Sequence, residues 1–135
     1  MKILLTLTLF VTFGFADFIH KGETVIDTQT HLQWQDIPNN GEKDEIHKLA
    51  KSYCIQSRVG GFDDWRLPTK KELQELAKKM QNKQIFHYSD EVSYWTSDED
   101  KEDELNAWAI YFPNAHAFTE DKCEKEHFRC VRTVK

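Results

Sequence analysis

The ten residues from Gly60 to Thr69, with the sequence Gly-Gly-Phe-Asp-Asp-Trp-Arg-Leu-Pro-Thr, constrain the fold more than any other part of the chain. Two adjacent glycines can take positive φ values, so the backbone can turn sharply at their position. Pro68 fixes its own φ and favours an extended residue before it, which separates the turn from the next element. Thr69 and Glu72 have the T-x-x-E spacing of a capping box, which marks the start of a helix. The stretch therefore predicts an ordered connector that leads into a helix.

The two aspartates of this connector, Asp63 and Asp64, could be read as a metal or sugar pair. Aspartate is common in turns for structural reasons, and Arg66 could pair with one of these carboxylates. We therefore assign the connector a structural role, which its motif residues share: Trp65, Arg66, Leu67, Pro68, Thr69 and Glu72.

An amphipathic helix is predicted on each side of the connector. Between residues 44 and 57 the apolar residues recur at i, i+3, i+4, i+7 and i+8, and between residues 70 and 81 a second stripe appears. Each helix has a single apolar side and must therefore cover another element. The two stripes are Ile46, Leu49, Ala50, Tyr53 and Cys54 in the first helix, and Leu73, Leu76, Ala77 and Met80 in the second.

The remaining patterns indicate strands. Residues 25–27 and 32–34 read as a hairpin with Ile26, Leu32 and Trp34 facing inward, followed by a turn over residues 38–41. Residues 93–97 favour a strand, residues 107–112 a central strand, and residues 116–119 a strand that pairs back. A last strand over residues 128–134 would lie near the first if the termini meet. This order predicts one α+β domain over residues 17–135, with two helices on a small, mostly antiparallel sheet with long loops.

The N-terminus has the pattern of a secretory signal peptide. Lys2 precedes an apolar run over residues 3–13, and small residues at positions 14 and 16 predict cleavage after Ala16. The run is shorter than the roughly 20 apolar residues of a membrane span. An uncleaved N-terminal anchor is the alternative. We expect an exported protein, periplasmic or extracellular, that does not associate with a membrane after cleavage.

The charge balance disfavours polyanionic partners. The chain has 18 Lys and Arg against 23 Asp and Glu, a formal charge of −5, and the loss of Lys2 with the signal makes it −6. There is no excess of cations to neutralise phosphates or sulfates. Nucleic acid is therefore excluded as an expected partner.

The three cysteines of an exported chain imply one disulfide and one leftover thiol. Cys54 lies on the apolar side of the first predicted helix, and Cys130 shares a strand face with Phe128 and Val134. Cys123 stands among charged residues of a solvated loop. The faces favour the pair Cys54–Cys130, and a Cys123–Cys130 bridge that clips a hairpin is the alternative.

The chain resembles the Lcl C-terminal domain family, named after the C-terminal domain of the Legionella collagen-like adhesin. The shared residues, in order, are Thr30-x-Leu32-x-Trp34, Ala50-x-x-Tyr53-Cys54, Gly61 to Thr69 with Glu72-Leu73, Tyr94 to Ser97, Ala107-Trp108 with Phe112, and Arg129 to Arg132. The resemblance implies a C-type-lectin-like fold, close to sulfatase-modifying factors, in which a helix cysteine pairs with one in the final strand. His47 stands where the family usually has Trp. The chain lacks a collagen-like repeat, so no trimeric adhesin arrangement is implied.

The acidic stretch over residues 98–104 lies where lectin-like folds carry their long ligand loop. Its oxygen ligands would suit Ca²⁺, but it lacks the glycine and the spacing of an EF-hand, and runs of charge are usually solvated. We expect no cofactor, with Ca²⁺ as the cation that this loop would take. The predicted ligand-loop residues are Asp98, Glu99, Asp100, Asp103 and Asn114.

Other candidate chemistry has a structural explanation. Trp95 and Trp108 could stack on a sugar ring, but their strand context favours the core. The six histidines form no zinc motif, and the chain contains neither G-x-S-x-G nor S-x-x-K. Cys123 and His127 have i, i+4 spacing, but the neighbouring glutamates would raise the thiol pKa and oppose its activation.

We therefore expect an exported, non-enzymatic binding module whose ligand is a glycan or an envelope or cell-surface protein. The loops around residues 97–106 and 113–127 would bind it. The alternatives are a thiol-dependent enzyme or redox protein that uses Cys123, and a periplasmic structural or inhibitor protein without a small ligand.

Overall fold

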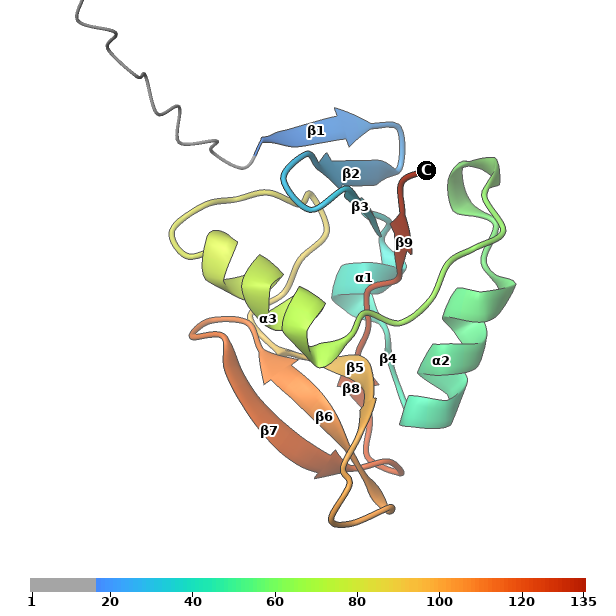
Figure 1. Cartoon of the computed structure of the whole chain (residues 1–135), viewed down its shortest axis with the longest axis vertical. Coiled ribbons are helices and arrows are strands. Elements are labelled where there is room, and N and C mark those ends of the chain that lie inside the picture. The colour runs from blue at the N-terminus through green and yellow to red at the C-terminus, as the bar shows by residue number, and fades with distance from the viewer. Residues whose placement is uncertain (1–16) are drawn as a thin grey trace, which may run out of the picture.

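The computed structural model describes residues 17–135, so the predicted signal peptide lies outside the described residues. Within them the chain forms an α+β domain with three α-helices and two mostly antiparallel sheets, which confirms the predicted fold class. Figure 1 shows β1 to β3 (within residues 18–35) at one end of the molecule, the β5–β6–β7 strands (within residues 93–121) at the other, and α3 (Lys70–Lys79) between them. No helix in residues 17–135 has the length and apolar character that crossing a membrane requires.

The first sheet contains strands from both ends of the described chain. It contains β1 (Phe18–Lys21), β2 (Thr24–Asp27), β3 (Leu32–Gln35) and β9 (Val131–Thr133), in the order β1-β2-β3-β9. The predicted hairpin is present as β2 and β3, and the last strand pairs with β3.

One inward residue of this hairpin was predicted wrongly. Val25 pairs with Trp34, and both are buried, whereas Ile26 pairs with Gln33 on the opposite face and is only partly buried. Alternate strand residues face opposite sides, so one position of register decides which apolar residue enters the core. Leu32 and Trp34 face inward as predicted.

The second sheet has the order β4-β8-β5-β6-β7. Its strands are β4 (Asp44–Glu45), β8 (Glu126–His127), β5 (Ser93–Glu99), β6 (Asn106–Tyr111) and β7 (His116–Asp121). The predicted central strand is β6, which lies between β5 and β7. The neighbours Ala109 and Ile110 are both fully buried, because each face of this strand is covered.

The helices are α1 (Asn39–Glu42), α2 (His47–Gln56) and α3 (Lys70–Lys79). The predicted turn over residues 38–41 is largely occupied by α1. The predicted apolar face of α2 was partly wrong, because its buried residues are His47, Ala50 and Cys54, whereas Leu49 is 49% exposed. Residues 44–45 form a strand, so the helix starts later and turns a narrower stripe toward the core. α3 buries Leu73, Leu76 and Ala77 as predicted.

Two apolar clusters lie on opposite faces of the β5–β6–β7 strands. One contains Leu73 and Leu76 of α3 together with Tyr94 and Ile110, and it extends to the first sheet. The other contains Trp95 and Ala109 with residues of α2. Each fully buried Leu or Ile side chain stabilises the fold by roughly 1.5–3 kcal/mol, so Leu73 and Leu76 attach α3 firmly to the sheet.

Cys54 and Cys130 form a disulfide, with Cα atoms 5.4 Å apart and 76 residues apart in sequence. This is the pair that the sequence favoured. Both residues are fully buried in the second cluster, where the bond joins α2 to the residue before β9. Cys123 is free and exposed.

The connector has the predicted turn and helix start. Gly60 and Gly61 have φ values of 66° and 81°, and Thr69 and Glu72 make both hydrogen bonds of the capping box. The ion pairs differ from the prediction, because Arg66 makes a bidentate contact with Glu72 (2.7 and 2.9 Å). Asp64 is paired with Arg132 at 2.7 Å, which lowers the pKa of Asp64. Arg66, which follows the aspartates in sequence, extends toward α3 and pairs with Glu72. The partner of Asp64 therefore comes from β9, a strand that is distant in sequence.

Candidate functional site

A groove lies between the start of α3 and the β5–β6 hairpin. We call it the Trp108 groove, and its volume is about 630 Å³. Its lining combines one tryptophan with several charged side chains and one hydroxyl: Lys70, Asp98, Glu99, Asp100, Lys101, Glu102, Trp108 and Thr119. It is therefore the place where the acidic loop predicted from the sequence meets an aromatic residue.

Trp108 is partly exposed, contrary to the prediction that it belongs to the core, whereas Trp95 is fully buried. Trp108 pairs with Thr119, and Ile110, two residues along the same strand face, packs in the cluster beneath α3. The helix begins at Lys70, beside the tryptophan, so it covers Trp108 only in part. The exposure of the Trp108 ring therefore depends on where α3 begins. The periodicity of the strand does not reveal that position.

The connector positions the wall of the groove. The Ser97 amide donates to the Pro68 carbonyl (2.8 Å), and the Lys70 amide donates to Oδ2 of Asp98 (2.8 Å). Asp98 thus caps the free end of α3, where a negative charge is favourable. Lys70 then extends over the ring of Trp108, with Nζ 3.5 Å from the ring centroid.

Three other carboxylates of the acidic loop, those of Glu99, Asp100 and Asp103, have partners within the domain. Asp100 accepts from the Glu102 amide (3.0 Å), and Asp103 accepts from the Leu105 amide (3.0 Å). Lys122 contacts Glu99 at 3.2 Å and lowers the pKa of that carboxyl. Within residues 17–135, no three ligand atoms of this loop lie within 4.8 Å of one another.

The predicted ligand residues fall into two places. Asp98, Glu99 and Asp100 line the Trp108 groove, and Asp103 lies in the adjoining turn of the same hairpin. Asn114 lies in the β6–β7 turn, at the opposite end of β6, where its Oδ1 accepts from the His116 amide (3.0 Å). The structure therefore does not bring Asn114 to the acidic loop.

Cys123 and His127, the pair that the alternative of a thiol-dependent enzyme would use, make contacts with different residues. Cys123 lies in the turn between β7 and β8, where its amide donates to Asp121 (2.8 Å). The His127 ring packs against Tyr94, with centroids 5.7 Å apart. The described part of the chain contains no hydrogen bond between Cys123 and His127.

Glu126 carries a strongly shifted carboxyl group near this turn. Burial raises its pKa to about 7, and the negative charges of Glu120, Asp44 and Glu124 contribute in the same direction. The sequence showed only that this region is acidic. The pairing of β8 with β4 turns Glu126 into partly buried surroundings.

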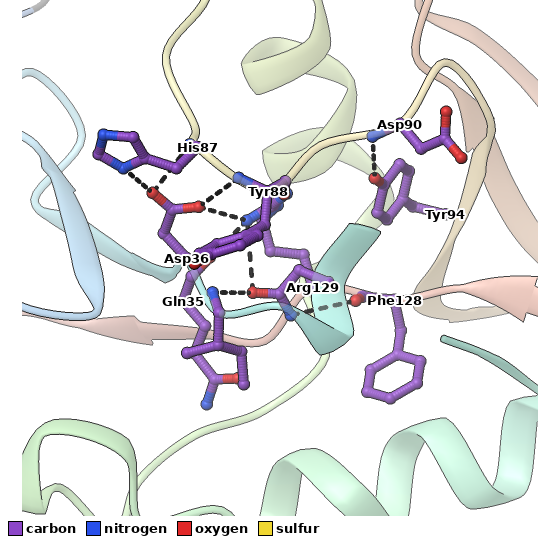
Figure 2. A network of polar contacts seen from close by, with 10 residues as sticks. Gln35, Asp36, His87, Tyr88, Asp90, Tyr94, Phe128 and Arg129 are labelled. Atoms are coloured by element: carbon purple, nitrogen blue, oxygen red, sulfur yellow. Dashed lines mark hydrogen bonds and ion pairs between the residues drawn. The ribbon is translucent and has the colours of Figure 1, made fainter. Parts of the chain in front are cut away.

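Sequence reasoning also missed a buried polar network around Arg129, which Figure 2 shows. Arg129 is fully buried, donates to the carbonyls of Gln35 and Tyr88, and stacks on Phe86 with its Cζ 3.8 Å from the ring centroid. Burial lowers the pKa of Arg129. Nη1 of Arg129 lies 4.0 Å from the carboxylate of Asp36, which is also buried.

A second cavity, of about 470 Å³, lies beside the segment between α3 and β5. Met80, Phe112 and Pro113 contribute apolar surface, and His87 and Asp90 are among its polar lining residues. It is separate from the Trp108 groove, with which it shares no lining residue.

Comparison with known proteins identifies the family. The family model described as the Lcl C-terminal domain matches residues 23–132, which include the connector, both disulfide cysteines and the Trp108 groove. A comparison with curated proteins finds no significant match. Because the family match covers most of the chain, this protein belongs to the Lcl C-terminal domain family.

Proposed function

We propose that this protein is an exported binding module that holds a glycan in the Trp108 groove. One observation carries the proposal: a partly exposed tryptophan stands beside several carboxylates in a groove of about 630 Å³. A partly exposed tryptophan on a strand is available to a ligand in a way that a core residue is not.

The residue types suit a sugar. The apolar face of a pyranose ring can pack against an indole, and the hydroxyl groups around the ring donate hydrogen bonds to carboxylates. Asp100 and Glu102 line the same groove and offer acceptors, and Thr119 adds a hydroxyl opposite Trp108 on the neighbouring strand. The β5–β6 hairpin and the capped start of α3 hold these groups on regular elements, which favours recognition without large rearrangement.

The charges favour a neutral or amino-sugar glycan over a sulfated one. Four carboxylates line the groove against two lysines, Lys70 and Lys101. A sulfated polymer would meet net negative charge, whereas a protonated amine would be attracted.

Lys70 has to leave the ring face before a sugar can stack on it. A cation–π contact at an exposed site contributes roughly 0.5–1 kcal/mol. Replacing Lys70 with alanine would therefore tighten the binding of a neutral glycan by up to about fivefold. Strong weakening by this replacement would instead indicate an anionic ligand.

Export is the part of the proposal that rests on the disulfide and the N-terminal pattern. Disulfides of this kind persist in oxidising compartments such as the periplasm or the extracellular space. A role in binding rather than catalysis fits the separate contacts of these two residues, because the Cys123 amide donates to Asp121 and the His127 ring packs against Tyr94.

A printed glycan array with neutral, amino-sugar and sulfated glycans tests the proposal, in buffer with Ca²⁺ and in buffer with EDTA. The variants are Trp108→Ala and the matched control Tyr111→Ala, an exposed aromatic (39%) on the same strand but outside the groove. We expect binding to neutral or amino-sugar glycans that Trp108→Ala abolishes, that Tyr111→Ala leaves unchanged, and that does not require Ca²⁺. Absence of glycan binding, or equal binding by Trp108→Ala, would refute the groove as the site.

A further inference from the structure

Three side chains with metal-binding chemistry meet outside the Trp108 groove. One ligand atom each of His20, Asp36 and His87 lies within 4.8 Å of the other two. The rings of His20 and His87 are 5.1 Å apart between centroids, and Nδ1 of His87 is 3.0 Å from Oδ2 of Asp36. This is the one such group of histidine, cysteine and carboxylate side chains within residues 17–135.

The group is assembled by tertiary structure. His20 lies on β1, Asp36 directly follows β3, and His87 lies in the segment between α3 and β5. Both histidines are exposed, whereas Asp36 is buried. Two exposed imidazoles therefore face a fixed carboxylate at the surface.

The two oxygens of Asp36 have different surroundings, as Figure 2 shows. Oδ1 accepts from the Tyr88 amide (3.0 Å) and lies 4.0 Å from Nη1 of Arg129. Oδ2 accepts from the His87 amide (3.0 Å) and faces the His87 ring. Such secondary contacts orient a carboxylate ligand before a metal arrives.

We propose that His20, Asp36 and His87 form a binding site for a borderline transition-metal dication, Zn²⁺ in the first instance. Metal–ligand bonds of about 2.0–2.1 Å place tetrahedral ligands about 3.4 Å apart, so small rotations of the two exposed rings from the present spacing suffice. Three protein ligands leave a fourth position for water or another ligand.

The surroundings select the class of metal. Arg129 offsets part of the Asp36 charge, which weakens the attraction for cations that depend on oxygen ligands, such as Ca²⁺ and Mg²⁺. The two imidazole nitrogens then supply most of the binding energy, which suits Zn²⁺, Cu²⁺ and Ni²⁺.

A bound ion would connect an edge strand to a segment that the Asp36 and Arg129 contacts already hold in place. β1 pairs only with β2, at the edge of the first sheet. The metal would tie this edge strand to the segment that carries His87, so we expect Zn²⁺ to raise the thermal midpoint of the protein.

The test is a calorimetric Zn²⁺ titration of the full chain, expressed with its own N-terminal segment and without a histidine tag. All variants carry Cys123→Ser, because the exposed thiol is itself a zinc ligand. His20→Ala and His87→Ala remove ligands at exposed positions, and His116→Ala, an exposed histidine on β7, is the matched control.

We expect one Zn²⁺ per chain, at least about tenfold weaker binding in His20→Ala and in His87→Ala, and unchanged binding in His116→Ala. X-ray absorption at the zinc edge of the loaded protein should show two imidazoles and oxygen neighbours. Wild-type affinity in either ligand variant, equal weakening in the control, or no saturable Zn²⁺ binding would overturn the proposal.

Discussion

Replacing both Cys54 and Cys130 with alanine removes the covalent link between α2 and the start of β9. In the unfolded chain the bond closes a loop of 76 residues, and on the chain-entropy model this contributes about 4.5 kcal/mol at 25 °C. The two sulfur atoms are also fully buried, so their loss leaves a small gap that costs about 1 kcal/mol more. We expect the double variant to lose about 4–6 kcal/mol of unfolding free energy.

Urea unfolding followed by tryptophan fluorescence measures this loss. With a slope of about 1.5 kcal/mol per molar urea for a chain of this size, the midpoint should fall by about 3 M. The matched control is Cys123→Ser, which removes an exposed, unpaired thiol and should leave the midpoint unchanged. A fall of less than about 1 M in the double variant would refute the loop-entropy argument. A free Cys54 in a non-reducing peptide map of folded protein would refute the disulfide itself.

Two further predictions concern single side chains. Thr69→Ala removes a hydrogen bond of the capping box of α3 and should cost about 1 kcal/mol in urea unfolding, whereas Thr69→Ser should retain most of it; equal stability of both would contradict the cap. Glu126 has a folded pKa of about 7, above the ordinary value of 4.5, so the folded state binds more protons between these values. Stability should therefore fall as the pH rises through this window, and Glu126→Gln should flatten that slope and stabilise the protein near pH 8. Urea midpoints at about pH 5 and 8 test this, and an unchanged slope in the variant would contradict it.

Local chemistry accounts for the parts of the fold that the sequence predicted. Thr69 and Glu72 lie three residues apart and bond to each other's backbone whatever surrounds them, so the start of α3 could be predicted. The i, i+3, i+4 spacing of Leu73, Leu76 and Ala77 likewise determines one face of that helix.

The errors arose where the answer depended on a distant segment. Ile26 and Val25 both suit a strand, and only the pairing of Val25 with Trp34 decides which one is buried. Leu49 belongs to an apolar stripe, but the disulfide at Cys54 and the strand at residues 44–45 turn α2 so that His47 takes the inner position.

The candidate site shows the same division. The acidic loop could be recognised from its consecutive charged residues. Its position beside Trp108, however, depends on where α3 starts relative to β6. The His20, Asp36 and His87 group has no sequence signature, because its members come from three separate segments.

The sequence by itself determined the α+β class, the connector with its helix start and the favoured cysteine pair, because each depends on residues that are neighbours in the chain or share a periodic face. Only the tertiary structure decided that the Trp108 ring is partly exposed, that β9 supplies the partner of Asp64, and that His20 and His87 lie close to each other. Those properties depend on the register and crossing of segments far apart in the chain, and the periodicity of a single segment does not determine its partner or its crossing.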